Sequence, residues 1–137
     1  MKLLAKAVLT AALISGVAQA GVVVIANPTG PDALTKSQVS KLYLGKSKKL
    51  PNGDKAEVIE QAEGRPIRAA FHDAVTGKND AQLQAYWSRL VFTGKGKPPK
   101  MIGSAALIKS QVASHANAIA YIDSSEVDDS VKVVYTP

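Results

Sequence analysis

The stretch VVVIANP, residues 22–28, decides the fold class. Its first five residues are all apolar, four of them are β-branched, and Asn27-Pro28 ends the run. A strand without alternating polar and apolar residues is typically buried on both faces. Such strands belong to layered folds in which helices cover a sheet on both sides. The sequence therefore predicts an α/β protein.

The remaining chain alternates between helix and strand patterns. Each helix pattern joins a capping residue or a proline to apolar residues spaced three or four apart. Each strand pattern is a short apolar run bounded by turn residues. The predicted helices begin at Thr35, with Gln38 completing a capping box, at Pro66, at Asp80 as the cap and at Ser104; the predicted strands cover residues 56–61, 118–122 and 131–135. The predicted order is β-α-β-α-α-α-β-β.

The third predicted helix contains the only tryptophan of the chain, Trp87. Trp87 shares one face of this helix with Leu83, Leu90 and Val91. A stripe of this kind normally packs against the core. We therefore expect Trp87 to be buried in the helical layer.

The first twenty residues have the pattern of a secretory signal peptide. Lys2 and Lys6 precede an apolar run over residues 7–17, and Ala18-Gln19-Ala20 offers the small residues of a cleavage site. The run is shorter than the ~20 residues that span a bilayer. The sequence predicts cleavage after Ala20, one domain over residues 21–137 without a membrane span, and a periplasmic location.

Charge and cysteine content narrow the function. The chain has 17 Lys and Arg residues against 11 Asp and Glu residues, and removing the two lysines of the leader lowers the formal net charge from +6 to +4. This modest excess, together with export, favours small anions or acidic partners over nucleic acid. The chain has no cysteine, so disulfides cannot stabilise it.

No motif supports catalysis, a metal or a cofactor. Gly45-Lys46-Ser47 resembles part of a nucleotide phosphate loop, but Ser40 stands where that loop needs a glycine. His72 and His115 are the only histidines and lack metal-ligand spacing. No serine lies in a nucleophile elbow. The sequence predicts a protein that is not an enzyme.

The stretch EGRPIRAAF, residues 63–71, is the candidate binding motif. If a helix begins near Arg65, its unpaired N–H groups and positive dipole end suit an oxyanion, and Arg65 and Arg68 can add guanidinium forks. The alternative is that both arginines point into water from a polar helix face. Spacing alone favours the alternative.

A set of short motifs carries a resemblance to a known family. They are Leu44-Gly45-Lys46 followed by Pro51-Asn52-Gly53, Arg68 with Phe71, Tyr86-Trp87 through Phe92-Thr93-Gly94, Pro98-Pro99, and Ala118 to Ile122. Together they resemble the substrate-binding proteins of phosphate ABC transporters, in the type II periplasmic-binding superfamily. The resemblance implies a single-lobe, three-layer α/β sandwich around a mixed central sheet of about four to five strands.

The resemblance yields the first of two functional hypotheses, a periplasmic binding module for phosphate or a similar oxyanion in ABC-type uptake. The expected ligand residues are Arg65 and Arg68 at the helix start and Asn27 or Thr29 after the first strand, since open α/β sheets bind ligands beyond the carboxyl ends of their strands. The expected partners are a transporter permease and a second lobe or a second copy.

The second hypothesis is an envelope interaction domain that keeps the lobe without binding a ligand. In the family, a Ser-Gly-Thr tripeptide ahead of the arginine donates hydrogen bonds to phosphate. This chain has Arg65, Pro66 and Ile67 in those places. The substitution of that tripeptide favours the second hypothesis.

Overall fold

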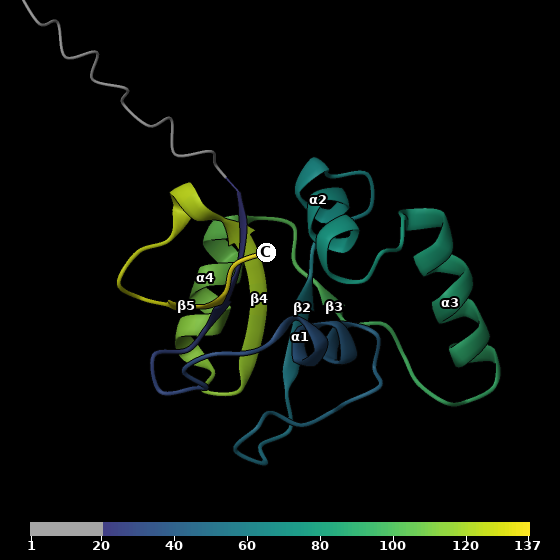
Figure 1. Cartoon of the computed structure of the whole chain (residues 1–137), viewed down its shortest axis with the longest axis horizontal. Coiled ribbons are helices and arrows are strands. Elements are labelled where there is room, and N and C mark those ends of the chain that lie inside the picture. The colour runs from purple at the N-terminus through teal and green to yellow at the C-terminus, as the bar shows by residue number, and fades with distance from the viewer. Residues whose placement is uncertain (1–20) are drawn as a thin grey trace, which may run out of the picture.

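The computed structural model describes residues 21–137, so the predicted leader and its cleavage site lie outside the described residues. Figure 1 shows the arrangement of the helices and strands. The elements are β1 (Val22–Ala26), α1 (Lys36–Tyr43), β2 (Glu57–Glu60), α2 (Pro66–Val75), α3 (Asp80–Phe92), β3 (Lys100–Met101), α4 (Ala105–Ser114), β4 (Ala118–Asp123), a short 3-10 helix η1 (Ser124–Glu126) and β5 (Lys132–Tyr135).

The strands form one mixed sheet in the order β3-β2-β4-β1-β5. Strand β2 runs parallel to β3 and β4, whereas β1 runs antiparallel to β4 and β5. The mixed sheet predicted by the resemblance is confirmed, with five strands. The direction of β1 decides which residues share an edge of the sheet.

Strand β1 is buried on both faces, as its sequence predicts. Val24 and Ala26 join a core cluster with residues of α1 and α2, including Tyr43 and Phe71. Val23 and Ile25 join a second cluster with residues of α4. Helices therefore cover both faces of the sheet, and the predicted three-layer α/β sandwich is confirmed.

Local capping signals account for most helix starts. Thr35 and Gln38 form the predicted capping box of α1, Pro66 occupies the first turn of α2, and Ser104 caps α4. The predicted cap of α3 was wrong by one residue, because the cap is Asn79. The Asn79 side chain accepts a hydrogen bond from the Gln82 backbone N–H, and the Asn79 backbone N–H donates to the Gln82 side-chain oxygen. The two-residue strand β3 was not predicted, since Lys100 and Met101 are exposed and show no strand pattern.

Helix α3 differs from the prediction in its packing. Leu83 is its only buried residue, and Trp87 is only partly buried, so the prediction that Trp87 lies in the core was wrong. Helices α1 and α2 already cover the adjacent face of the sheet, and α3 lies beside the sheet (Figure 1). It contacts the end of α1 instead: the Tyr86 hydroxyl donates to the Leu44 carbonyl at 2.6 Å, and the Trp87 ring lies against Gly45.

None of the helices within residues 21–137 has the length and apolar character required to cross a membrane.

Candidate functional site

The N-termini of α2 and α4 lie close together at one edge of the sheet. Arg65 is the cap residue of α2 but makes no side-chain capping bond, and Pro66 follows it. The Arg65 guanidinium instead donates from Nη1 to the Gly103 carbonyl at 2.7 Å, one residue before the Ser104 cap of α4. Arg65 thus links two helix ends whose dipoles are both positive.

A hollow of about 410 Å³ lies between these two helix ends. Its charges are mixed, since the carboxylates of Asp123 and Glu126 line it together with the single guanidinium of Arg65. Hydrogen bonds from the Ser125 backbone and hydroxyl lower the pKa of Asp123, so that this carboxylate stays ionised. The hollow is lined by Val22, Gln61, Arg65, Pro66, Ile67, Ala70, Ala105, Asp123 and Glu126.

Arg68 does not reach this hollow and does not point into water. Its side chain is buried, with Nε donating to Asp80 Oδ1 at 2.7 Å and Nη1 donating to the Gln61 carbonyl at 2.8 Å. Its Nη1 also lies 3.8 Å from Glu60 Oε1. The water-facing alternative is therefore wrong for Arg68, whose guanidinium is held by the protein itself.

Glu60, at the end of β2, is the centre of a buried polar cluster. Its carboxylate accepts hydrogen bonds from the Tyr121 hydroxyl, the Gln61 backbone and His72 Nε2, the last at 2.7 Å. Burial and the Glu60 charge raise the pKa of Tyr121 and of Tyr43, so both hydroxyls stay protonated. The cluster links β2, α2 and β4 through Glu60, His72 and Tyr121. Sequence reasoning missed Glu60, because a carboxylate at the end of a short strand that also begins with Glu57 has no pattern that predicts its burial.

Asn27 and Thr29 lie at the opposite edge of the sheet from Arg65. Strand β1 is antiparallel to β4, and β4 is parallel to β2, so the carboxyl end of β1 lies beside the amino end of β2. The buried Asn27 amide donates to the carbonyls of Val112 and Ala113 at 3.0 Å and accepts from the Thr29 backbone and hydroxyl. Asn27 therefore binds the end of α4, and the structure does not bring it to the arginines.

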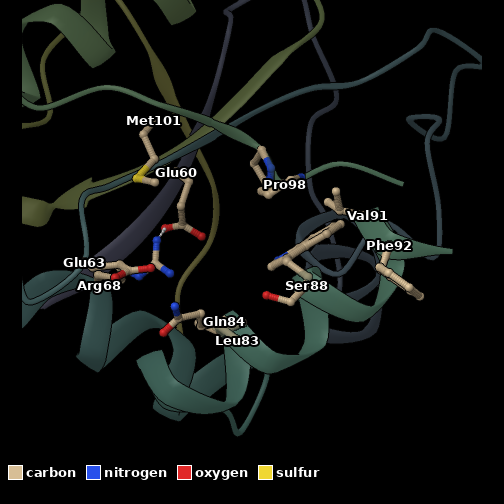
Figure 2. A pocket seen from close by; sticks show the side chains of 12 residues that line it. Glu60, Glu63, Arg68, Leu83, Gln84, Ser88, Val91, Phe92, Pro98 and Met101 are labelled. Carbon is tan, nitrogen blue, oxygen red and sulfur yellow. Dashed lines mark ion pairs between the residues drawn. The ribbon is translucent and has the colours of Figure 1, made fainter. Parts of the chain in front are cut away.

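A second cleft, of about 450 Å³, lies between α3 and the side of the sheet that is formed by β2 and β3. Figure 2 shows Glu60, Glu63 and Arg68 at one end and Val91 and Phe92 at the other. Most of the remaining lining is apolar, formed by Leu83, Trp87, Pro98, Pro99 and Met101. The cleft exists because α3 stands away from the sheet.

The histidines contact carboxylates rather than one another. His72 bonds to Glu60 and Thr76, and His115 bonds to Glu57 at 2.6 Å. Within residues 21–137, no three His, Cys, Asp or Glu side chains are grouped closely enough to hold a metal ion.

Comparison with known proteins finds similarity at the level of structure. No protein-family model and no curated protein matches the sequence. An ABC-type phosphate transport receptor from Vibrio cholerae matches with a TM-score of 0.66 and 19% identity, over 83% of this chain and 45% of the receptor. A putative phosphate ABC transporter substrate-binding protein with bound phosphate, from Clostridium perfringens, matches with a TM-score of 0.66 and 28% identity, over 83% of this chain and 44% of that protein.

A possible phosphate binding protein from Planctomyces limnophilus matches with a TM-score of 0.62 and 12% identity, over 83% of this chain and 40% of its own length. These matches confirm the resemblance seen in the sequence and show a periplasmic-binding-protein-like α/β fold. The chain spans less than half the length of the solved proteins it matches.

Proposed function

We propose that this protein is a binding module for phosphate or a similar small oxyanion, serving ABC-type phosphate uptake without enzymatic activity of its own. The observation that carries the proposal is the hollow at the paired N-termini of α2 and α4, with Arg65 beside it. Helix N-termini bind oxyanions through free N–H groups and a positive dipole end. The fold supports the same role, since a similar protein from Clostridium perfringens has phosphate bound.

Within this proposal, Arg65 is the ligand residue and Arg68 is a positioning residue. The guanidinium of Arg68 is occupied by Asp80 and by the Gln61 carbonyl, so it orients the segment that leads into α2. Asn27 and Thr29 do not enter the proposed site, because they lie at the other edge of the sheet.

The site predicts weak binding by this chain alone. A hydrogen bond to a charged group contributes about 1.5–3 kcal/mol, and a helix N-terminus contributes about 1 kcal/mol. One such bond and the two helix N-termini together give about 3.5–5 kcal/mol, which corresponds to a dissociation constant on the order of 1 mM. Because the chain spans less than half of the similar proteins, we infer that a second lobe or a second copy closes over the hollow in the working assembly.

The proposed setting is the periplasm, with a transporter permease as partner. It depends on cleavage of residues 1–20 as a leader. Mass spectrometry of the exported protein should find Gly21 as the first residue. Retention of Met1 would contradict this part of the proposal.

Two features of the hollow favour an envelope interaction domain as a second candidate. Asp123 and Glu126 line the same hollow as Arg65 and oppose an anion there. Pro66 also removes one backbone donor from the start of α2. A lobe with these features could retain the fold while binding a protein partner.

An NMR titration with phosphate separates the two candidates. If the site binds, the amide signals of Gly64, Arg65, Ile67 and Ala105 should shift and approach saturation at about 10 mM phosphate. The variant Arg65→Gln should lose these shifts, whereas Arg89→Gln, which removes an exposed arginine of α3, should retain them. Equal shifts in both variants, or none with the native protein, would favour the interaction domain.

A further inference from the structure

Two lysine-rich segments, far apart in the sequence, meet at one edge of the fold. The first is the turn of residues 46–55, which precedes β2, and the second is the loop of residues 93–99, which precedes β3. Because β2 and β3 are parallel, the segments that precede them lie at the same edge of the sheet. Figure 1 shows both at the lower edge of the molecule. The proposed oxyanion site follows β2 and lies at the opposite edge.

These segments form a cleft of about 510 Å³ that we name the lysine cleft. Its rim contains five exposed lysines: Lys48, Lys55, Lys95, Lys97 and Lys100. None of the five forms an ion pair within residues 21–137, where the paired lysines are Lys109 and Lys132. The cleft therefore concentrates positive charge, although the Glu57 carboxylate lies near Lys100, and it attracts anions.

Exposed apolar side chains lie directly beside the lysine cleft. Phe92 at the end of α3 is 92% exposed, and Val91 and Met101 are each 54% exposed. Trp87, Pro98 and Pro99 line both the lysine cleft and the apolar cleft that contains Phe92. Figure 2 shows Val91 and Phe92 at the end of α3, on the far side of the cleft from Glu60. Lysines and an exposed aromatic side chain thus occupy neighbouring positions on one edge.

We propose that this edge binds the surface of an anionic phospholipid bilayer. The lysines would contact headgroup phosphates, while Phe92 and Val91 enter the boundary between headgroups and acyl chains. Charge complementarity selects this occupant, because a bilayer offers both many phosphates and an apolar layer beside them. A small free anion would use the lysines but leave Phe92 without a role. A second copy would have to bring an acidic surface, and the acidic segment of residues 123–129 follows β4 at the opposite edge.

Binding to the bilayer and binding of phosphate at Arg65 are independent. The two sites lie at opposite edges of the sheet and share no lining residue. Loss of one activity by substitution should leave the other intact, so each proposal can fail without the other.

Sedimentation with vesicles of phosphatidylglycerol or of phosphatidylcholine tests the proposal. The native chain should sediment with phosphatidylglycerol vesicles at low salt, dissociate at high salt, and ignore phosphatidylcholine vesicles. The single tryptophan, Trp87, lines both clefts, so its emission should shift to the blue on binding. All variants contain the same residues 1–20, so differences in vesicle binding between the variants do not come from those residues.

Matched variants separate charge from insertion. The double variant Lys95→Gln/Lys97→Gln should weaken binding about 30-fold, and Phe92→Ser should weaken it about 10-fold and reduce the blue shift. The control Lys78→Gln/Lys109→Gln removes the same charge from residues that do not line the lysine cleft, and should bind like the native chain. Circular dichroism should show all variants folded.

Three results would overturn the proposal. The first is the absence of binding to phosphatidylglycerol, or binding that the lysine substitutions and their control weaken equally. The second is binding that Phe92→Ser does not change and that soluble polyphosphate displaces, which would make the lysine cleft a site for a free polyanion. The third is concentration-dependent dimerisation that Phe92→Ser abolishes, which would make this edge an interface between two copies.

Discussion

Helices α2 and α3 follow one another in the chain, yet only α2 is part of the core. Helix α2 buries Arg68, Phe71, His72 and Val75, whereas the longer α3 buries Leu83 alone. Both have apolar residues at helical spacing. The difference shows that an apolar stripe is buried only where a sheet face remains uncovered, and α1 and α2 already cover the face nearest to α3.

The two helices also use different local signals at their starts. Helix α3 has a complete capping box from Asn79 and Gln82, whereas α2 has no side-chain cap and begins with Pro66. Packing stabilises most helices in proteins. Helix α3 has little packing and relies on its cap and on contacts with the end of α1, such as that of Tyr86 with Leu44. The following predictions test this division between a packed helix and a capped one.

The largest expected effect is that of Phe71→Ala in α2. Phe71 is completely buried, and its ring stacks on Tyr121 with centroids 4.0 Å apart. Truncation of such a side chain should lower the free energy of unfolding by about 3–5 kcal/mol. The same substitution in α3, Phe92→Ala, should change the free energy of unfolding by no more than about 0.5 kcal/mol. Urea denaturation measures both, and similar losses would contradict the comparison.

Arg68→Ala should have the next largest effect. It leaves the buried Glu60 carboxylate without its guanidinium neighbour and the Gln61 carbonyl without a donor. Breaking a buried ion pair costs about 3–5 kcal/mol, and the partial exposure of Asp80 puts the expected loss near 3 kcal/mol. The matched change Arg89→Ala, at an exposed position of α3, should leave the free energy of unfolding nearly unchanged.

Trp87→Ala should have an intermediate effect. A tryptophan has about 200 Å² to bury, and loss of half of that area at ~25 cal/mol per Å² costs about 2.5 kcal/mol. The expected result is thus smaller than for Phe71→Ala, although tryptophan is the larger residue. A loss above that of Phe71→Ala, measured by urea denaturation, would show that α3 is as firmly packed as α2.

Local signals in the sequence predicted the elements that depend on local chemistry. The β-branched run of β1 and the capping box of Thr35 and Gln38 both appear in the structure as expected. The cap of α3 was missed by one residue, although Gln82, three residues after Asn79, completes a capping box with it. Strand β3 has no local signal, because only its pairing with β2 defines it.

The candidate site was harder to predict, because it depends on strand direction and long-range pairing. The expectation that Asn27 and Thr29 approach the arginines assumed that β1 runs parallel to β2, and no local pattern contains that information. The bonds of Glu60 with His72 and with Tyr121 join residues 12 and 61 positions apart. Arg68 was recognised as important, but its engagement with Asp80 required the folded geometry.

A smaller effect is expected from the cap of α3. Asn79→Ala removes the side-chain acceptor for the Gln82 backbone and should cost about 1 kcal/mol. The matched change at the cap of α2, Arg65→Ala, removes no capping bond and should cost less. Thermal unfolding followed by circular dichroism compares the two variants, and a larger loss for Arg65→Ala would reverse the assignment of α3 as the capped helix.

The smallest expected effect concerns Asp80, which connects the two helices. This carboxylate lies in the first turn of α3 and accepts hydrogen bonds from the Gly64 backbone and from Arg68 of α2. These hydrogen bonds lower the pKa of Asp80, and the bond from the Gly64 backbone has the larger effect. A lowered pKa in the folded state contributes stability that is present above the unfolded value of ~3.9 and is lost as the pH falls through the folded value.

Asp80→Asn should therefore make the free energy of unfolding less steep in pH below ~4. At neutral pH the loss should be only about 0–1 kcal/mol, because the side chain is partly exposed and water screens its charge. Asp73→Asn removes the same charge from an exposed position of α2 that forms no ion pair within residues 21–137, so the difference between the two variants reports the link itself. Urea denaturation at a series of acidic pH values makes the measurement. If Asp80→Asn leaves the acid slope unchanged, Asp80 does not couple α3 to α2, and the contacts at Tyr86 and Trp87 alone hold α3 in place.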